Sequence, residues 1–200
     1  MDLAVLALAF GAIFVVELPD KTFIAALVLS TRYPPLLVWL GVGAAFFVQT
    51  TVAVTAGSVV GLLPDTAVKS VSAAIFLLGA FLMFRASRSA DEDEAEEEEE
   101  YAAKAAAPKH GFGVVVASFL VLFAAEWGDL SQLLTISLVA KYDDVVSVFL
   151  GAWGALLAVS GLAVLVGRFL LSHVRLATIF ALGGTVCLAL FGFTVYEIVS

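Results

Sequence analysis

The stretch Glu17-Leu18-Pro19-Asp20-Lys21-Thr22 has a counterpart 109 residues later, Glu126-Trp127-Gly128-Asp129-Leu130-Ser131, and each copy lies inside a long apolar segment. Shared composition alone rarely produces matches along a whole half of a chain, so the sequence predicts an internal repeat. The same register, with one inserted residue after the first pair, aligns residues 32–33 with 141–142 and 40–41 with 150–151, and similar residues recur at 74–79 and 178–183.

The composition is that of a membrane protein. Of the 200 residues, 62% are hydrophobic and 14% are charged, and the mean hydropathy is +1.07, whereas soluble domains are about half apolar and a quarter charged. The uncharged runs at residues 36–63 and 145–167 each exceed the roughly 20 residues that span a hydrocarbon core. The single cysteine, Cys187, lies in an apolar run, which excludes a disulfide-stabilised secreted scaffold.

The net charge of −8 is concentrated in one segment. Nine of the eighteen acidic residues lie between positions 91 and 100, interrupted only by Ala95. We expect a solvated loop here, and a role in gathering cations is the alternative. The ten Lys and Arg residues form no basic stripe, so no nucleic-acid partner is expected.

Polar breaks divide the chain into six apolar segments, which predicts an all-α integral membrane protein with six transmembrane helices. Three segments lie on each side of the acidic linker and form two three-helix repeats. Because three is an odd number of spans, the second repeat must be inverted in the bilayer, with a binding site expected near the midplane. The predicted units are repeat 1 at residues 1–84, an acidic linker at residues 85–111 and repeat 2 at residues 112–200.

The distribution of basic residues predicts the orientation. The breaks after the second and fourth segments carry only Lys69 and Lys141, whereas the other three breaks carry seven basic residues in total. We therefore expect an integral membrane protein of the bacterial plasma membrane, with the acidic linker in the cytoplasm and both termini outside. The basic residues on the cytoplasmic side would be Arg32, Arg85, Arg88, Lys104, Lys109, Arg168 and Arg175.

Four acidic residues lie within apolar segments: Glu17 and Asp20 in the first segment, and Glu126 and Asp129 in the fourth. Each costs on the order of 3 kcal/mol to insert into a bilayer, so the four require a functional reason. A spacing of three places both acids of a pair on one helix face, and the inverted repeat would bring the two faces together. The sequence therefore predicts one cage of four carboxylates near the midplane.

Further oxygen atoms lie close to these acids in sequence. The hydroxyl groups of Thr22 and Ser131 and the amide oxygen of Gln132 would join the cage. Pro19, inside the first helix, would leave the carbonyl oxygen of Val15 without its hydrogen bond and therefore available as a ligand. Such an all-oxygen site suits hard divalent cations, which include Mn²⁺ and Ca²⁺.

Lys21 stands beside the first pair of acids and would be their charge partner. Buried ion pairs alone are the alternative explanation for these acids, but a single lysine cannot neutralise four carboxylates. Since protons and cations compete for the same oxygen atoms, the cage favours exchange of a divalent cation for protons. Gln49 and Thr50 in the second segment would line the ion path or make packing contacts.

These residues resemble the Gdt-type cation/proton exchangers of the lysine-exporter superfamily, which include manganese and calcium transporters. The family motif, E-x-G-D-[KR]-[ST], occurs once in each of two three-helix repeats, and it matches residues 17–22 and 126–131. Two positions depart from it, because Pro19 replaces the first glycine and Leu130 the second basic residue. The resemblance implies a secondary-active antiporter that exports or sequesters Mn²⁺, with Ca²⁺ as the alternative ion. It also implies cation-binding roles for Glu17, Asp20, Thr22, Glu126, Asp129 and Ser131.

Two other functions are compatible with the sequence. The wider superfamily contains exporters of amino acids and other organic cations. Trp127-Gly128-Asp129 also resembles part of the GxGD motif of intramembrane aspartyl proteases, although Glu126 stands where that motif has glycine. We expect a transporter rather than an enzyme, with no prosthetic group and with lipid, a divalent cation and protons as its partners. The sequence indicates no oligomeric state.

Overall fold

The structure, a computed structural model, describes residues 1–18, 20–105, 109–173 and 176–199. Pro19 and Arg175, which entered the predictions of a freed carbonyl and of the orientation, lie outside these ranges. The described residues contain no strand and form nine helices: α1 (Leu3–Glu17), α2 (Lys21–Arg32), α3 (Pro35–Val60), α4 (Asp65–Ala86), α5 (Ala90–Lys104), α6 (Phe112–Ala125), α7 (Leu130–Tyr142), α8 (Val145–His173) and α9 (Leu176–Val199).

These helices provide up to six membrane crossings. Helices α3, α4, α8 and α9 are each long and apolar enough to span a bilayer. Helices α1 and α2 meet at a bend of 69°, and α6 and α7 meet at a bend of 75°, so each bent pair can form one broken span. The prediction of an all-α membrane protein with six transmembrane segments is confirmed, with the first and fourth segments broken.

The breaks fall between the two acids of each pair. Helix α1 ends at Glu17, and Asp20 caps α2 by accepting a hydrogen bond from the Lys21 backbone amide at 2.8 Å. Asp129 caps α7 by accepting a hydrogen bond from the Gln132 backbone amide at 3.0 Å, and aspartate is a preferred N-cap residue. Gly128 precedes it with φ of +82°, a backbone conformation that glycine adopts without strain. The prediction that each pair lies on one face of a continuous helix was therefore wrong.

The two halves pack in equivalent ways. Helix α1 lies against α8, and its counterpart α6 lies against α3. At the first contact Gly151 faces the backbone of α1 at the carbonyl of Leu6, and at the second Gly41 faces the backbone of α6 at the carbonyl of Val115. These residue pairs follow the register of the sequence repeat, and small residues permit such close helix contacts in membranes.

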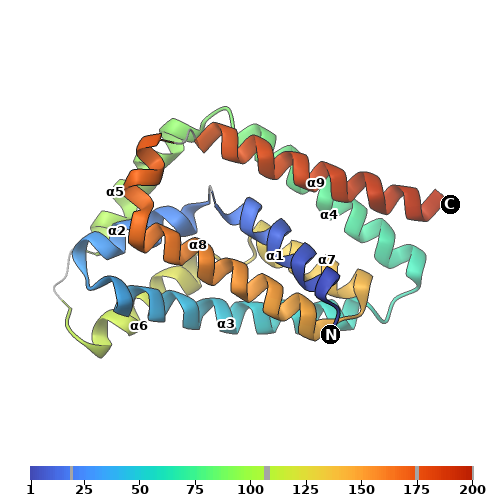
Figure 1. Cartoon of the computed structure of the whole chain (residues 1–200), viewed down its shortest axis with the longest axis horizontal. Helices are drawn as coiled ribbons and strands as arrows, with labels where there is room; N and C mark the ends of the chain where they lie inside the picture. The colour runs from blue at the N-terminus through green and yellow to red at the C-terminus, as the bar shows by residue number, and fades with distance from the viewer. Residues whose placement is uncertain (19, 106–108, 174–175, 200) are drawn as a thin grey trace.

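The positions of the last helix of each repeat, of the chain termini and of α5 agree with an inverted pair of repeats. Helices α4 and α9, the last of each repeat, run side by side along one edge of the molecule (Figure 1). Both termini lie in the same half of the long axis, and α5 lies in the other half. The linker and the termini are thus on opposite sides, as expected when each repeat crosses the membrane three times.

Most of the acidic linker is the helix α5, where the sequence had predicted a solvated loop. Its Glu and Ala residues are strong helix formers, and Lys104 pairs with Glu100 one turn away at 2.6 Å. The helix packs against α2, so that Tyr101 is only 3% exposed. The Tyr33 hydroxyl donates a hydrogen bond to the carbonyl of Ala105 at 3.2 Å. The linker is therefore docked on the transmembrane helices.

We predict that Gly41→Ala and Gly151→Ala each lower the free energy of unfolding by roughly 2 kcal/mol, because the added methyl group must displace the backbone of the facing helix. Thermal unfolding in detergent measures the effect. Gly192→Ala on α9 is the matched control, since no described atom lies within 4 Å of the added methyl group. Equal melting temperatures for the three variants would contradict the close packing.

Candidate cation-binding site

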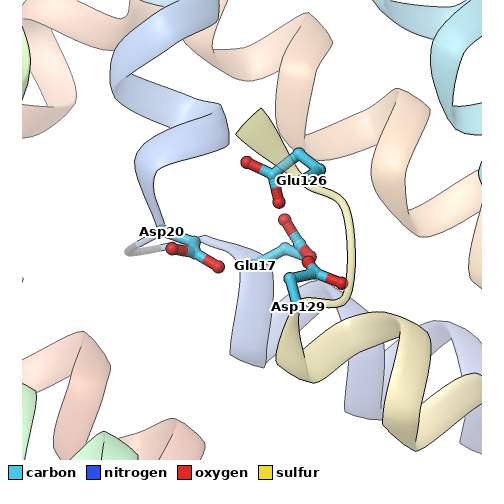
Figure 2. Close-up of side chains that lie close together, drawn as sticks. All are labelled: Glu17, Asp20, Glu126 and Asp129. Atoms are coloured by element: carbon cyan, nitrogen blue, oxygen red, sulfur yellow. The ribbon is translucent and has the colours of Figure 1, made fainter. Parts of the chain in front are cut away.

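Four acidic side chains converge where the two broken spans meet. Glu17 and Asp20 come from the break between α1 and α2, and Glu126 and Asp129 come from the break between α6 and α7. Figure 2 shows the four carboxylates directed into the space between these breaks. One oxygen atom of each residue lies within 4.8 Å of those of the other three. The structure thus brings together acids that are 109 residues apart in sequence.

The width of the cluster matches the oxygen shell of one cation. Oxygen ligands on opposite sides of Ca²⁺ are about 4.6–5.2 Å apart, and those on opposite sides of Mg²⁺ are about 4.0–4.2 Å apart. The separation limit of 4.8 Å in the cluster therefore allows all four carboxylates to contact a single ion of the size of Ca²⁺. Small movements of the side chains would adapt the cluster to a slightly smaller ion.

The two glutamates accept no hydrogen bond from the part of the chain that the structure describes. Glu17 is 0% exposed and Glu126 is 2% exposed. None of their four carboxylate oxygens accepts a hydrogen bond from the described residues. A buried ionised carboxylate without a donor or counter-ion is strongly destabilising. These oxygens therefore require a bound cation or a proton.

The two aspartates are held by the half-helices that they cap. The carboxylate of Asp129 accepts hydrogen bonds from the Ser131 hydroxyl at 2.9 Å and from the Gln132 backbone amide at 3.0 Å. Asp20 accepts its hydrogen bond from the first amide of α2. Capping fixes the position of each carboxylate and places it at the positive end of a helix dipole. The glutamates and aspartates thus have different surroundings within one cluster.

The oxygen atoms of the other predicted ligands differ in whether they already have a hydrogen-bond partner. The hydroxyl group of Thr22 is buried and has no hydrogen-bond partner among the described residues. The amide oxygen of Gln132 accepts a hydrogen bond from the Gly128 amide at 3.1 Å, so it is already engaged. The carbonyl oxygen of Val15 lies beside Gly183 on α9. Its release by Pro19 stays a prediction, because Pro19 is outside the described residues.

The positions that follow the aspartates do not face the cluster. Lys21 is exposed, and no ion pair within the described part of the chain joins it to the four carboxylates. Lys21, the expected charge partner of the first pair of acids, therefore forms no direct ion pair with them among the described residues. In the second repeat, Leu130 packs on Gly79 of α4, with a methyl carbon 3.1 Å from where a Cβ on this glycine would lie.

A small cavity adjoins the second pair of acids. Its volume of ≈ 10 Å³ is about that needed to hold one water molecule. Gln49 and Thr50, predicted to line the ion path or to pack, are both 3% exposed and line this cavity. The polar side chains that line it are Gln49, Thr50, Glu126, Asp129, Ser131, Gln132 and Thr135.

Two residues near the site were missed by the sequence predictions. Thr135 lines the cavity one turn after Ser131, and the spacing of four residues on one helix was a usable signal. Tyr101 comes from the linker helix. Burial raises the pKa of Tyr101, and the nearby carboxylates of Glu126 and Asp20 add to this effect. No sequence pattern connects Tyr101 to these acids, because only the docking of α5 brings them close.

Comparison with known proteins identifies one matching family. The profile of the divalent cation/proton antiporter GDT1 family matches residues 5–91 and 114–198, which include both acidic motifs. A GDT1-like protein of Synechocystis is 33% identical over 180 residues, covering 86% of this chain and 87% of the relative. GDT1-like protein 3 of Arabidopsis thaliana is 31% identical over 204 residues, covering 94% of this chain and 68% of the relative. No solved structure matches.

We predict that cysteines at positions 17 and 126 can be bridged by Cd²⁺ or a short thiol crosslinker. The double variant Glu17→Cys/Glu126→Cys, built with Cys187→Ala, tests this through a mobility shift on gels after cleavage in the linker. The control pair Glu17→Cys/Trp127→Cys should not be bridged, because the Trp127 side chain is 60% exposed. Failure of the first pair to crosslink would contradict the convergence of the two breaks.

Proposed function

Because the chain belongs to the GDT1 family of divalent cation/proton antiporters, we propose that it exchanges Mn²⁺ for protons, with Ca²⁺ as the alternative cargo. The ligands in this proposal are Glu17, Asp20, Glu126 and Asp129. Members of the family are transporters, so the prediction that the chain is not an enzyme is confirmed and the aspartyl protease alternative is excluded.

One observation carries the proposal: the buried cluster of carboxylates contains glutamate oxygens with no donor from the protein. Four ionised carboxylates would give the cluster a formal charge of −4. A divalent cation supplies two positive charges, and two protons supply the same amount. Exchange of one divalent cation for two protons would therefore leave the charge of the buried cluster unchanged, which avoids the cost of an uncompensated charge.

The competition between cation and protons follows from the chemistry of the ligands. A carboxylate must lose its proton before it binds a metal ion, so cation binding releases protons and protonation releases the cation. Access to the cluster from one side of the membrane at a time would then couple the two gradients. The two breaks are the proposed sites of the movement, because at each of them two half-helices meet at a bend of 69° or 75°.

The cluster also supports an inorganic cation over an organic one. The four carboxylate oxygens lie within 4.8 Å of one another, so the space between them is that of a single metal ion. The donors are oxygen atoms only, which favours Mn²⁺ and Ca²⁺ over cations that prefer thiolate or imidazole. The width of the cluster allows ligand shells larger than the rigid shell of Mg²⁺.

We further propose that the chain works in the bacterial plasma membrane, with its linker in the cytoplasm and its termini outside. Helix α5 and the termini lie in opposite halves of the molecule, which supports a linker and termini on opposite sides of the membrane. The excess of basic residues on the linker side supports the assignment of that side to the cytoplasm. In this orientation a proton gradient directed inward would drive export of the cation. The proposed units remain repeat 1 at residues 1–84, the linker at residues 85–111 and repeat 2 at residues 112–200.

We predict that Glu17→Gln, Asp20→Asn, Glu126→Gln and Asp129→Asn each reduce Mn²⁺ flux by at least about tenfold, because each removes an anionic ligand worth more than 1.4 kcal/mol. Flux into proteoliposomes under an imposed pH gradient, with Mn²⁺ and Ca²⁺ compared, measures the loss. Glu98→Gln on α5 is the matched control, since this carboxylate is exposed at the surface. Normal flux in any two of the four variants would refute the shared site.

We also predict that the apparent affinity for Mn²⁺ weakens as the pH falls. Protons occupy the oxygen atoms that the cation needs, so the dissociation constant should rise by up to about tenfold per pH unit for each proton displaced. Titration calorimetry between about pH 8 and pH 6, in buffers of different protonation enthalpy, measures both the affinity and the number of protons released. A dissociation constant that does not change with pH would exclude direct competition.

A further inference from the structure

Helix α3 carries several hydroxyl side chains, and Thr50 behaves differently from the others. The hydroxyl groups of Thr51, Thr55 and Ser58 each donate a hydrogen bond to the carbonyl four residues earlier in the same helix, at 2.7, 2.7 and 2.8 Å. This is the usual arrangement for such residues in an apolar helix. The Thr50 hydroxyl is buried and has no hydrogen-bond partner in the described structure. The helix therefore does not satisfy this oxygen atom.

The surroundings of Thr50 show where its oxygen can be satisfied. Thr50 is 3% exposed and lines the small cavity together with Glu126 and Asp129. Gln49 also lines the cavity, and its amide nitrogen donates to the carbonyl of Phe123 on α6 at 3.2 Å. Since the nitrogen of Gln49 is engaged, its amide oxygen is the atom available to a cation. Two neutral oxygen donors thus adjoin the second pair of acids.

The second repeat does not duplicate this feature. In the register of the repeat, Val159 and Ser160 on α8 correspond to Gln49 and Thr50. Val159 offers no oxygen, and the Ser160 hydroxyl donates to the carbonyl of Leu156 in its own helix at 2.8 Å. Neutral oxygen atoms therefore reach the cluster from α3 and not from the equivalent position of α8.

We propose that Thr50 is a specificity-determining ligand, whose hydroxyl oxygen, with the amide oxygen of Gln49, completes the shell of the cation beside Glu126 and Asp129. The proposal rests on the proposed function and deepens it. Four carboxylates supply the charge, but Ca²⁺ takes six to eight oxygen ligands. Neutral oxygen atoms supply the remaining ligands without adding charge to a buried site. Because Ca²⁺ accepts more ligands than a small octahedral ion, loss of Thr50 should weaken Ca²⁺ binding more than Mn²⁺ binding.

The experiment compares Thr50→Val with Thr50→Ser and Thr51→Val. Thr50→Val removes the oxygen with little change of shape, Thr50→Ser keeps the oxygen, and Thr51→Val removes a hydroxyl that is bonded within the helix on its exposed side. Dissociation constants for Mn²⁺ and Ca²⁺ are measured by titration calorimetry in detergent, and flux is measured in proteoliposomes. Thr50→Val should raise the dissociation constant of Ca²⁺ about tenfold and that of Mn²⁺ about threefold. Thr51→Val should match the wild type, and Thr50→Ser should lose less affinity than Thr50→Val because it keeps the oxygen atom.

The outcomes separate the ligand role from the proposed function. If the wild type and Thr50→Val bind both cations equally well, the role of Thr50 is refuted while the antiporter function stands. An equal loss of cation affinity in Thr51→Val would also refute the ligand role of Thr50, because the effect would then come from helix stability. If the wild type binds and exchanges neither cation, the proposed function fails and the role of Thr50 fails with it. Thr50→Ala replaces Thr50→Val if the valine variant does not fold, as judged by its melting temperature.

Discussion

In a lipid bilayer, ionised carboxylates and unpaired backbone groups are tolerated only where the protein encloses them. This constraint organises the structure around the two helix breaks. Each break exposes the ends of two half-helices and carries two acids, so both must lie at the centre of the molecule rather than in contact with lipid. Helices α3 and α8 enclose them by packing on α6 and α1, and Gly41 and Gly151 permit the close approach that this enclosure requires.

The scaffold is nearly symmetric, but the chemistry at its centre is not. The equivalent glycines make equivalent contacts in the two halves, whereas Lys21 is exposed and Leu130 packs on α4. Asp129 accepts a hydrogen bond from the Ser131 hydroxyl. The equivalent hydroxyl of Thr22 has no hydrogen-bond partner among the described residues. A symmetric frame can present its site to both sides of a membrane in related conformations. Under the proposed function, an asymmetric ligand set would let one half hold the ion more firmly than the other.

The acidic linker has a structural role that its composition does not suggest. Glu96, Glu98, Glu99 and Glu100 are exposed on α5, but Tyr101 is buried against the transmembrane helices, where the carboxylates of Glu126 and Asp20 act on it electrostatically. Movement of α2 during transport would therefore move α5 as well, because the two helices pack together and Tyr33 bonds to the end of the linker helix. The linker is thus mechanically connected to the site and does more than join two halves.

The sequence alone determined the membrane class, the six segments, the repeat and the four acids, because hydropathy, spacing and residue type are local properties that lipid constrains strongly. It did not determine that the first and fourth segments are each broken, with Asp20 and Asp129 capping the start of the second half-helix, since capping competes with helix continuation and the outcome depends on tertiary packing. Only the tertiary structure decided that Lys21 is exposed, that α5 docks through Tyr101, and that the Thr50 hydroxyl is unsatisfied while that of Thr51 is bonded. Those features depend on which side chains from distant segments meet, and neighbours in sequence carry no information about such contacts.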